Sequence, residues 1–105
     1  MADGIIQPEA MIDIQEGMDY YNSKQSELGN KFHEFVSDAI DALRTNPFYQ
    51  IRYNEVRCLP LKKFPFMLHF HLNESVNEVN ILAVINTGSD PEMHWLNRGK
   101  MNLIL

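Results

Sequence analysis

The pair Asn46-Pro47 divides the chain into two parts that have different hydrophobic periods. Before this pair, apolar residues recur every three or four positions, which is typical of helices that bury one face. After it, β-branched and aromatic residues alternate with polar ones, which indicates strands. Proline lacks a backbone N–H and disfavours helix in the residue before it, so we expect the last helix to end here. A single change of period predicts helices followed by a sheet.

Two helices are predicted in the first part. Pro8-Glu9 favours a helix start, since proline is tolerated at the first helical position and an acid there complements the helix dipole. We expect the first helix over residues 8–24 and the second from Leu28 to just before Asn46, with a polar connection at 22–26 between them. Such a pair forms an antiparallel helical hairpin. The apolar stripes are Met11, Ile14, Met18 and Tyr21 in the first helix, and Leu28, Phe32, Phe35, Val36, Ala39 and Leu43 in the second.

The second part predicts a meander of strands. In the strand over 64–72, the even-numbered residues form an apolar face, which leaves Met67, His69 and His71 on the other face. A turn at 73–77 leads to residues 79–85, which are apolar enough for a central strand. Residues 5–7 are a candidate short first strand, and Asp90-Pro91 favours a short C-terminal helix that contains Trp95. The predicted fold is α+β in one domain over residues 1–105: an N-terminal antiparallel helical hairpin packed on a small twisted, mainly antiparallel β-sheet.

Composition narrows the location and the partners. Cys58 is the only cysteine, so no disulfide can form within the chain, and we expect a reducing cytoplasm. The first residues do not have the pattern of a secretion signal, and the longest aliphatic run, 81–85, is too short to cross a bilayer. We expect no membrane contact and no cofactor.

The charge is unevenly distributed along the chain. The formal net charge of −5 argues against a general nucleic-acid binder, because phosphate contacts need clustered Lys and Arg. Residues 46–63 nevertheless have a local balance of +3, whereas residues 1–45 have −6. Two interpretations stay open: a modest basic patch on one side of the fold, or ordinary solvated surface charge.

Several short segments between residues 8 and 95 occur together in one protein family. They are, in chain order, Pro8-Glu9-Ala10, Tyr20-Tyr21, Leu28-Gly29 with Phe32, Asn46-Pro47, Val56-Arg57, Leu61 with Lys62-Lys63-Phe64-Pro65, the strand over 79–85, and Asp90-Pro91 before Trp95. In this order and spacing the chain resembles the RelE/ParE superfamily of toxins from bacterial type II toxin–antitoxin (plasmid stabilisation) systems. The resemblance implies the same α+β fold, with a helical hairpin on a twisted antiparallel sheet.

The resemblance also implies candidate catalytic residues. RelE-type members are ribosome-dependent endoribonucleases, in which basic residues on the open face of the sheet hold mRNA while a 2′-OH attacks the adjacent phosphate. Arg57 is the best candidate for the phosphate contact, because a guanidinium grips two phosphate oxygens and stays charged. Lys62 and Lys63 would supply further charge. The competing interpretation for Arg57 is an ion pair with Glu55 or with a helix acid.

The chain departs from the family at its usual reactive positions. Phe66 stands where many members have a Tyr, and residues 86–89, Asn-Thr-Gly-Ser, stand where a His followed by an Arg is common. Those positions would supply an acid/base group and a cation for the transition state. His69 and His71 share a strand face and are candidate replacements. With no acidic or cysteine partner at a suitable spacing, we expect them to bind no metal.

Three functions remain open. The first is favoured, because the usual His and Arg are missing: a toxin that binds a large target, as ParE-type members bind DNA gyrase. The second is a RelE-type nuclease acting on ribosome-bound mRNA, built on Arg57, Lys62 and Lys63 with His69 or His71. The third is a non-toxic binding protein that keeps the toxin fold. All three predict a small antitoxin protein as partner, and a homodimer is a further assembly to consider.

Overall fold

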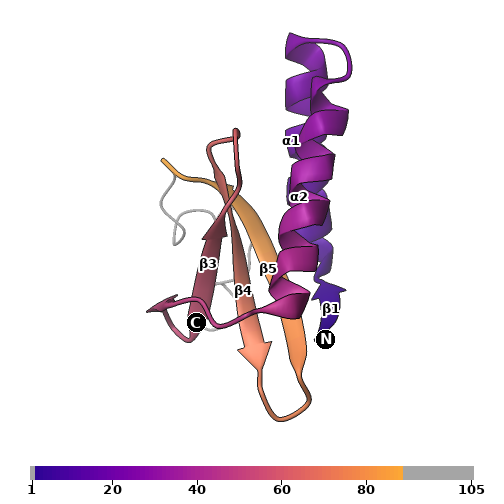
Figure 1. Ribbon diagram of the computed structural model, residues 1–105. Coiled ribbons are helices and arrows are strands. Elements are labelled where there is room, and N and C mark those ends of the chain that lie inside the picture. The colour runs from indigo at the N-terminus through magenta and orange to yellow at the C-terminus, as the bar shows by residue number, and fades with distance from the viewer. Residues whose placement is uncertain (1, 89–105) are drawn as a thin grey trace.

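Residues 2–88 are described by a computed structural model, in which two helices lie along one face of a five-stranded sheet (Figure 1). The strand order is β1-β5-β4-β3-β2; β1 is parallel to β5 and the other neighbours are antiparallel. This confirms the predicted α+β architecture; a short first strand is present over Asp3–Ile6 and not over residues 5–7, and the predicted helix around Trp95 lies outside the described residues. The elements are β1 (Asp3–Ile6), α1 (Pro8–Lys24), α2 (Leu28–Thr45), β2 (Ile51–Tyr53), β3 (Val56–Pro60), β4 (Phe66–Asn73) and β5 (Glu78–Asn86).

Both helices have the bounds that the sequence predicts. Pro8 is the first residue of α1, and Asn46 caps the end of α2 with its backbone N–H bonded to the carbonyl of Ala42. The buried face of α1 differs from the predicted stripe, however, since Met11 is 55% exposed. The small residues Ala10 and Gly17 are buried instead, beside Ile14. Small side chains let α1 lie close to its neighbours, and hydrophobicity alone does not reveal this.

The two helices approach each other closely at two glycines. A Cβ atom on Gly17 of α1 would lie 2.7 Å from Cζ of the Phe32 ring, so only glycine leaves room for that ring. A Cβ atom on Gly29 of α2 would overlap the carbonyl oxygen of Met18, which belongs to the backbone of α1. The Gly29 N–H also donates to Oδ1 of Asn22, at 2.8 Å. The hairpin is therefore fixed by contacts that involve backbone, and its tip projects beyond the end of the sheet (Figure 1).

The core lies between the hairpin and the covered face of the sheet. Leu68, Phe70 and Leu72 of β4 are buried, as the alternation in β4 predicts. At the upper end of the core, aromatic rings from both helices meet rings from β4 and the loop before it, with centroids 4.8–6.1 Å apart. Edge-to-face contacts of this kind add to the free energy gained by burial. These rings belong to Tyr21, Phe32, Phe35, Phe64 and Phe66.

A buried carboxylate completes the edge of β5. Strand β1 ends opposite Ile81, so Val84, further along β5, has no partner on β1. Asp13 of α1 takes that place: its Oδ2 accepts a hydrogen bond from the Val84 N–H at 3.0 Å, and the residue is only 4% exposed. One extra residue in β5, Leu82, interrupts the pairing with β4 just before this point. Helix α1 thus serves as the edge partner of β5 where β1 has ended.

Candidate functional site

The face of the sheet opposite the helices contains a small polar cluster. Cys58 on β3 pairs with His69 on β4, so their side chains lie on the same face. The Nδ1 atom of His69 is 2.9 Å from the Tyr53 hydroxyl oxygen and 3.4 Å from the Cys58 Sγ. His69 is 4% exposed and Cys58 7%. Three neighbouring strands therefore place a phenol, a thiol and an imidazole in contact.

The hydrogen bonds of this cluster constrain the imidazole. The Tyr53 hydroxyl and the Cys58 thiol can each donate or accept, so the tautomer decides the direction of both contacts; with its proton on Nε2, the ring accepts from both at Nδ1. In this state Nδ1 already accepts two hydrogen bonds and is not available to take a proton from a substrate. The geometry suits a structural histidine better than a general base at Nδ1.

The Cys58 thiol is held in its protonated form. Burial raises its pKa, and the positive charge of Arg52 opposes that effect only in part. A thiolate is the reactive form of cysteine, so a raised pKa makes this side chain a poor nucleophile at neutral pH. Burial therefore disfavours Cys58 as the nucleophile of a cysteine-based reaction.

We expect Cys58 to react slowly with thiol reagents in the folded protein, at least about 100-fold more slowly than an exposed thiol, because labelling needs both local opening and a thiolate. The measurement is the rate of labelling by a chromogenic disulfide reagent at pH 7.5, with and without denaturant. Ser26→Cys provides the control, since it adds a thiol in the exposed connection between the helices. Equal labelling rates for Cys58 and the added thiol would contradict the assignment.

Arg57, the predicted phosphate contact, lies on the other face of the sheet. It pairs with Phe70, whose side chain is in the core under the helices. Its Nη1 donates to the carbonyl oxygen of Tyr49 at 2.9 Å, and its guanidinium carbon lies 5.9 Å from the centroid of the Phe48 ring. No described acid forms an ion pair with it, so the alternative pairing with Glu55 is not observed. Arg57 fastens the segment between α2 and β2 to β3.

The remaining candidates are spread along the sheet. Lys62 and Lys63 are exposed in the connection between β3 and β4. His71 is exposed and pairs with Val56 at the start of β3. The lysines follow the other end of β3, where Pro60 pairs with Met67. The two pairs are four residues apart along the strand, which corresponds to roughly 13 Å. Only His69 and His71 share a face. The structure brings none of the other candidates next to them, and the catalytic roles stay a prediction.

The two positions that depart from the family have structural roles in this chain. Phe66 is half-buried, and its ring lies 5.1 Å from that of Phe32 and 6.1 Å from that of Tyr21. Asn86 Oδ1 accepts a hydrogen bond from the Gly88 N–H at 2.8 Å, which closes an exposed turn after β5. Neither position supplies a proton donor or a cation. Residues 2–88 contain no group of three or more His, Cys, Asp and Glu side chains that could hold a metal ion.

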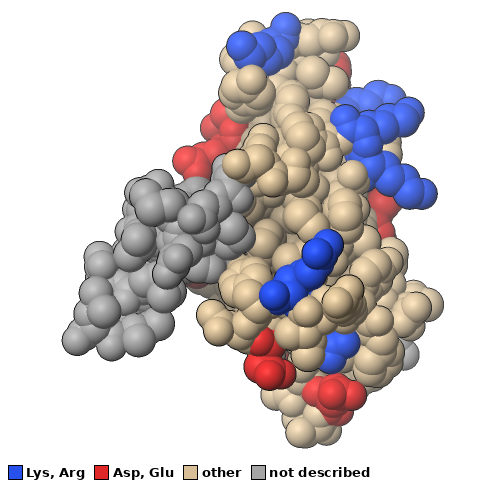
Figure 2. Space-filling model, turned by 90° about the vertical axis from the view of Figure 1, so that its left-hand side faces the viewer, with Lys and Arg blue, Asp and Glu red and all other residues tan. Residues whose placement is uncertain are grey.

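Charge on the molecular surface is divided. Figure 2 shows Lys and Arg in separate groups on the face that it presents, with acidic side chains beside or between them. The basic residues of 46–63 are likewise separated, since Arg57 lies near the start of β3 and Lys62 follows its end. A broad basic surface of the kind that nucleic-acid binding needs is not visible on this face. Over residues 2–88, neither α1 nor α2 combines the length with the hydrophobicity that a membrane-spanning helix needs.

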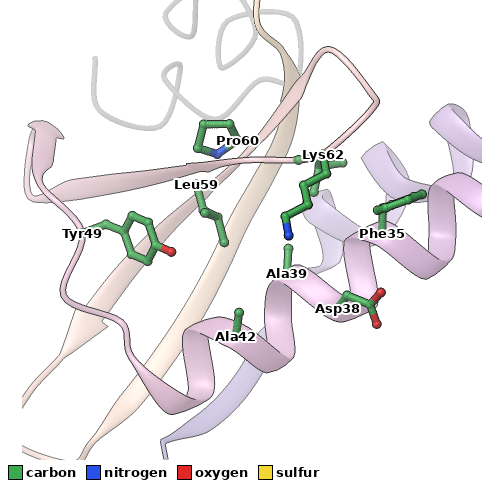
Figure 3. Close-up of a pocket in the computed structure, with 9 residues that line it drawn as sticks. Phe35, Asp38, Ala39, Ala42, Tyr49, Leu59, Pro60 and Lys62 are labelled. Atoms are coloured by element: carbon green, nitrogen blue, oxygen red, sulfur yellow. The ribbon is translucent and has the colours of Figure 1, made fainter.

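Two hollows lie between α2 and the β3–β4 side of the sheet, and the sequence did not predict them. One hollow, of about 370 Å³, lies between α2 and β3, where Leu59, the Tyr49 hydroxyl and Lys62 point toward the helix (Figure 3). A second, of about 360 Å³, is lined by both helices and the β3–β4 connection. Phe35 lines both hollows. The signal in the sequence was the row of Phe35, Ala39 and Ala42, where small residues on one side of an apolar stripe leave space.

The comparisons with known proteins agree with this fold. Neither protein-family models nor curated protein sequences gave a match. Among solved structures, a chain from the chromosomal ParDE toxin–antitoxin system of P. aeruginosa is similar with a TM-score of 0.71. The chain has a ParE-like fold. The likeness covers 82% of this chain and 96% of the other at 21% sequence identity, so it confirms the predicted RelE/ParE-type architecture at the level of the fold.

Proposed function

We propose that the chain is the toxin of a type II toxin–antitoxin pair and that it acts in the cytoplasm by binding a large cellular target, with DNA gyrase as the first candidate. The observation that carries the proposal is the arrangement of reactive side chains in a ParE-like fold. Arg57 is on the covered face, Nδ1 of His69 is in contact with both the Tyr53 hydroxyl and the Cys58 thiol, and His71 is roughly 13 Å along the strand from the lysine end of β3.

Acid–base cleavage of RNA requires a base, an acid and cations that meet at one phosphate. Each missing group commonly costs on the order of 10²-fold in rate. Binding to a large target makes no such demand, because it needs only a complementary surface. A ParE-like toxin therefore fits this chain better than a RelE-type nuclease, and the ParDE system to which the similar structure belongs supports an antitoxin as the partner.

We expect induced expression of the chain in a bacterial host to stop growth with DNA damage and filamentation, while protein synthesis continues at first. The measurement is cell length, a DNA-damage reporter and the rate of amino-acid incorporation over the first minutes. The variant His71→Ala removes an exposed side chain on the open face and should remain toxic.

Two other outcomes would contradict the proposal. An early stop in protein synthesis that His71→Ala abolishes would favour the nuclease. Normal growth at high levels of folded protein would favour a non-toxic binding protein. If a short open reading frame adjoins this one, its product should restore growth when co-expressed, as an antitoxin would.

A further inference from the structure

We propose that the exposed segment between α2 and β2 carries the surface with which this chain contacts its large protein target. The inference rests on the proposed function, since it names where that target docks and what chemistry it offers. The surface consists of Phe48, Ile51, Arg52 and Arg57, and we call it the Phe48 surface. It lies at the outer strand of the sheet, where the chain has crossed from the end of α2 to β2 (Figure 1). The partner that it fits has an apolar pocket for the Phe48 ring and carboxylates beside that pocket.

Phe48 is exposed although its ring is large and apolar. It is 66% exposed, the highest value among the exposed large apolar side chains of residues 2–88. Ile51, which is 44% exposed, extends this apolar area along β2. Aromatic side chains of this kind contribute a large share of the binding free energy at protein interfaces when a pocket of the partner covers them.

The backbone around Phe48 is fixed by several contacts, although it belongs to no helix or strand. The N–H of the next residue, Tyr49, donates to the carbonyl oxygen of Pro47 at 2.9 Å. Arg57 Nη1 donates to the Tyr49 carbonyl oxygen at 2.9 Å, and the Tyr49 ring meets the Phe70 ring edge-on with centroids 6.4 Å apart. A partner that buries Phe48 therefore loses little free energy in ordering this side of the interface.

The charge of the Phe48 surface is positive. Residues 46–54 contain no acid, and their one charged side chain is the exposed Arg52. Arg57 pairs with Ile51 across the two strands, and its guanidinium carbon lies 5.9 Å from the centroid of the Phe48 ring. No described acid forms an ion pair with either arginine. Carboxylates of the partner are therefore the complementary charge for this surface.

Two other occupants fit the Phe48 surface less well. A second copy of the chain would bring like charges together, and Phe48 and Ile51 expose only roughly 200 Å², against about 800 Å² per partner in a stable interface. Single-stranded nucleic acid is held by a groove of cations with several aromatic platforms. Here Arg57 already donates to the Tyr49 carbonyl, which leaves few free donors for phosphates. A protein pocket with an acidic rim satisfies both the ring and the charge.

Growth arrest at graded induction in a bacterial host tests the surface, with the amount of soluble chain measured by immunoblot. Phe48→Ala should need at least about 10-fold more protein for the same arrest, because it removes the side chain that fills the pocket. Tyr20→Ala removes a ring that is 55% exposed on α1, and it should stay within about twofold of the unaltered chain. Both variants should keep Tm within about 3 °C, since neither ring is buried. An equal loss of toxicity in both variants would overturn the inference.

Two substitutions at Ile51 separate charge from apolar area. Ile51→Asp and Ile51→Lys both remove the same apolar side chain from an exposed strand position, and the new charges have opposite signs. Next to an acidic rim, Ile51→Asp should weaken the arrest at least about fivefold more than Ile51→Lys. Equal effects, or a larger loss with Ile51→Lys, would contradict an acidic partner.

Failure of the surface and failure of the toxin give different results. If the unaltered chain arrests growth and Phe48→Ala does so at the same protein level, the surface is wrong and the proposed toxin is unaffected. If the unaltered chain leaves growth normal at high levels of folded protein, both are wrong. Nucleic acid has its own measurement, the binding of a labelled single strand of about 12 nucleotides at about 150 mM salt. Binding that Phe48→Ala weakens at least about 10-fold would replace the protein partner by nucleic acid and overturn the inference.

Discussion

Replacing Gly29 by alanine is expected to destabilise the protein by about 2–4 kcal/mol, the largest effect of a single added methyl group in this fold. The new Cβ atom would overlap the Met18 carbonyl oxygen and lie 2.6 Å from Cγ of Asn22. The first of these is a backbone atom of α1, so the overlap is relieved only if the two helices separate. For a domain of this size, the change corresponds to a fall in Tm of roughly 10–20 °C.

Thermal unfolding followed by circular dichroism measures this effect, and Gly4→Ala is the matched control. A Cβ atom on Gly4 of β1 would lie 3.2 Å from Cδ of Arg44, which belongs to a flexible side chain that can move aside. Gly4→Ala should therefore change Tm by no more than about 3 °C. A Gly29→Ala protein that melts within that range of the unaltered chain would show that the hairpin tolerates a wider helix spacing than its contacts indicate.

The helical hairpin was the most predictable part of the fold, because its ends are marked by local chemistry. Pro8 starts α1, Asn46-Pro47 stops α2, and both apolar stripes have helical spacing. The tight spacing of the helices was less evident. Gly17 and Gly29 look like weak points in a helix, and their role depends on Phe32 and Met18 of the opposite helix, which only the packed structure brings together.

The candidate site was harder to predict, because it depends on strand register. The short turn between β2 and β3 uses Asn54 and Glu55 with φ values of 41° and 66°. Such turns usually contain glycine at the second position, so Asn-Glu gives a weak signal. The register that follows places Arg57 on the covered face and Cys58 beside His69. A shift of one residue would exchange these faces, and the spacing of Arg57 from other residues in the sequence cannot show which register forms.

The buried carboxylate of Asp13 was also hidden from sequence reasoning. It lies one residue from Ile14 in a helix with several acids, so it resembles the solvent-exposed Asp19 in the same helix. Its partner, the Val84 N–H, lacks a strand neighbour only because β1 ends opposite Ile81. The run of aliphatic residues around Leu82 likewise gives no sign of the irregular pairing there. Both features arise from the lengths of two strands that are far apart in the sequence.

Asp13→Leu is expected to lower the free energy of unfolding by about 3 kcal/mol, since it leaves the Val84 N–H without an acceptor. The site is buried, because Asp13 is only 4% exposed. Asp13→Asn keeps an acceptor oxygen of the same reach and should cost only about 1 kcal/mol. Denaturant unfolding measures both values. Asp19→Leu, at an exposed position of the same helix, is the control and should stay within about 0.5 kcal/mol of the unaltered chain.

Amide hydrogen exchange distinguishes the loss of this hydrogen bond from a general loss of stability. In Asp13→Leu the Val84 amide should exchange faster by a larger factor than amides elsewhere in β4 and β5, because β5 loses its edge partner at this residue. In Asp13→Asn the protection of Val84 should largely remain. If hydrogen exchange in Asp13→Leu becomes faster by the same factor for all amides of the sheet, the carboxylate stabilises the fold as a whole and not the free edge of β5. If exchange becomes faster mainly at the Val84 amide, α1 takes the place of a neighbouring strand there and lets β5 extend past the end of β1.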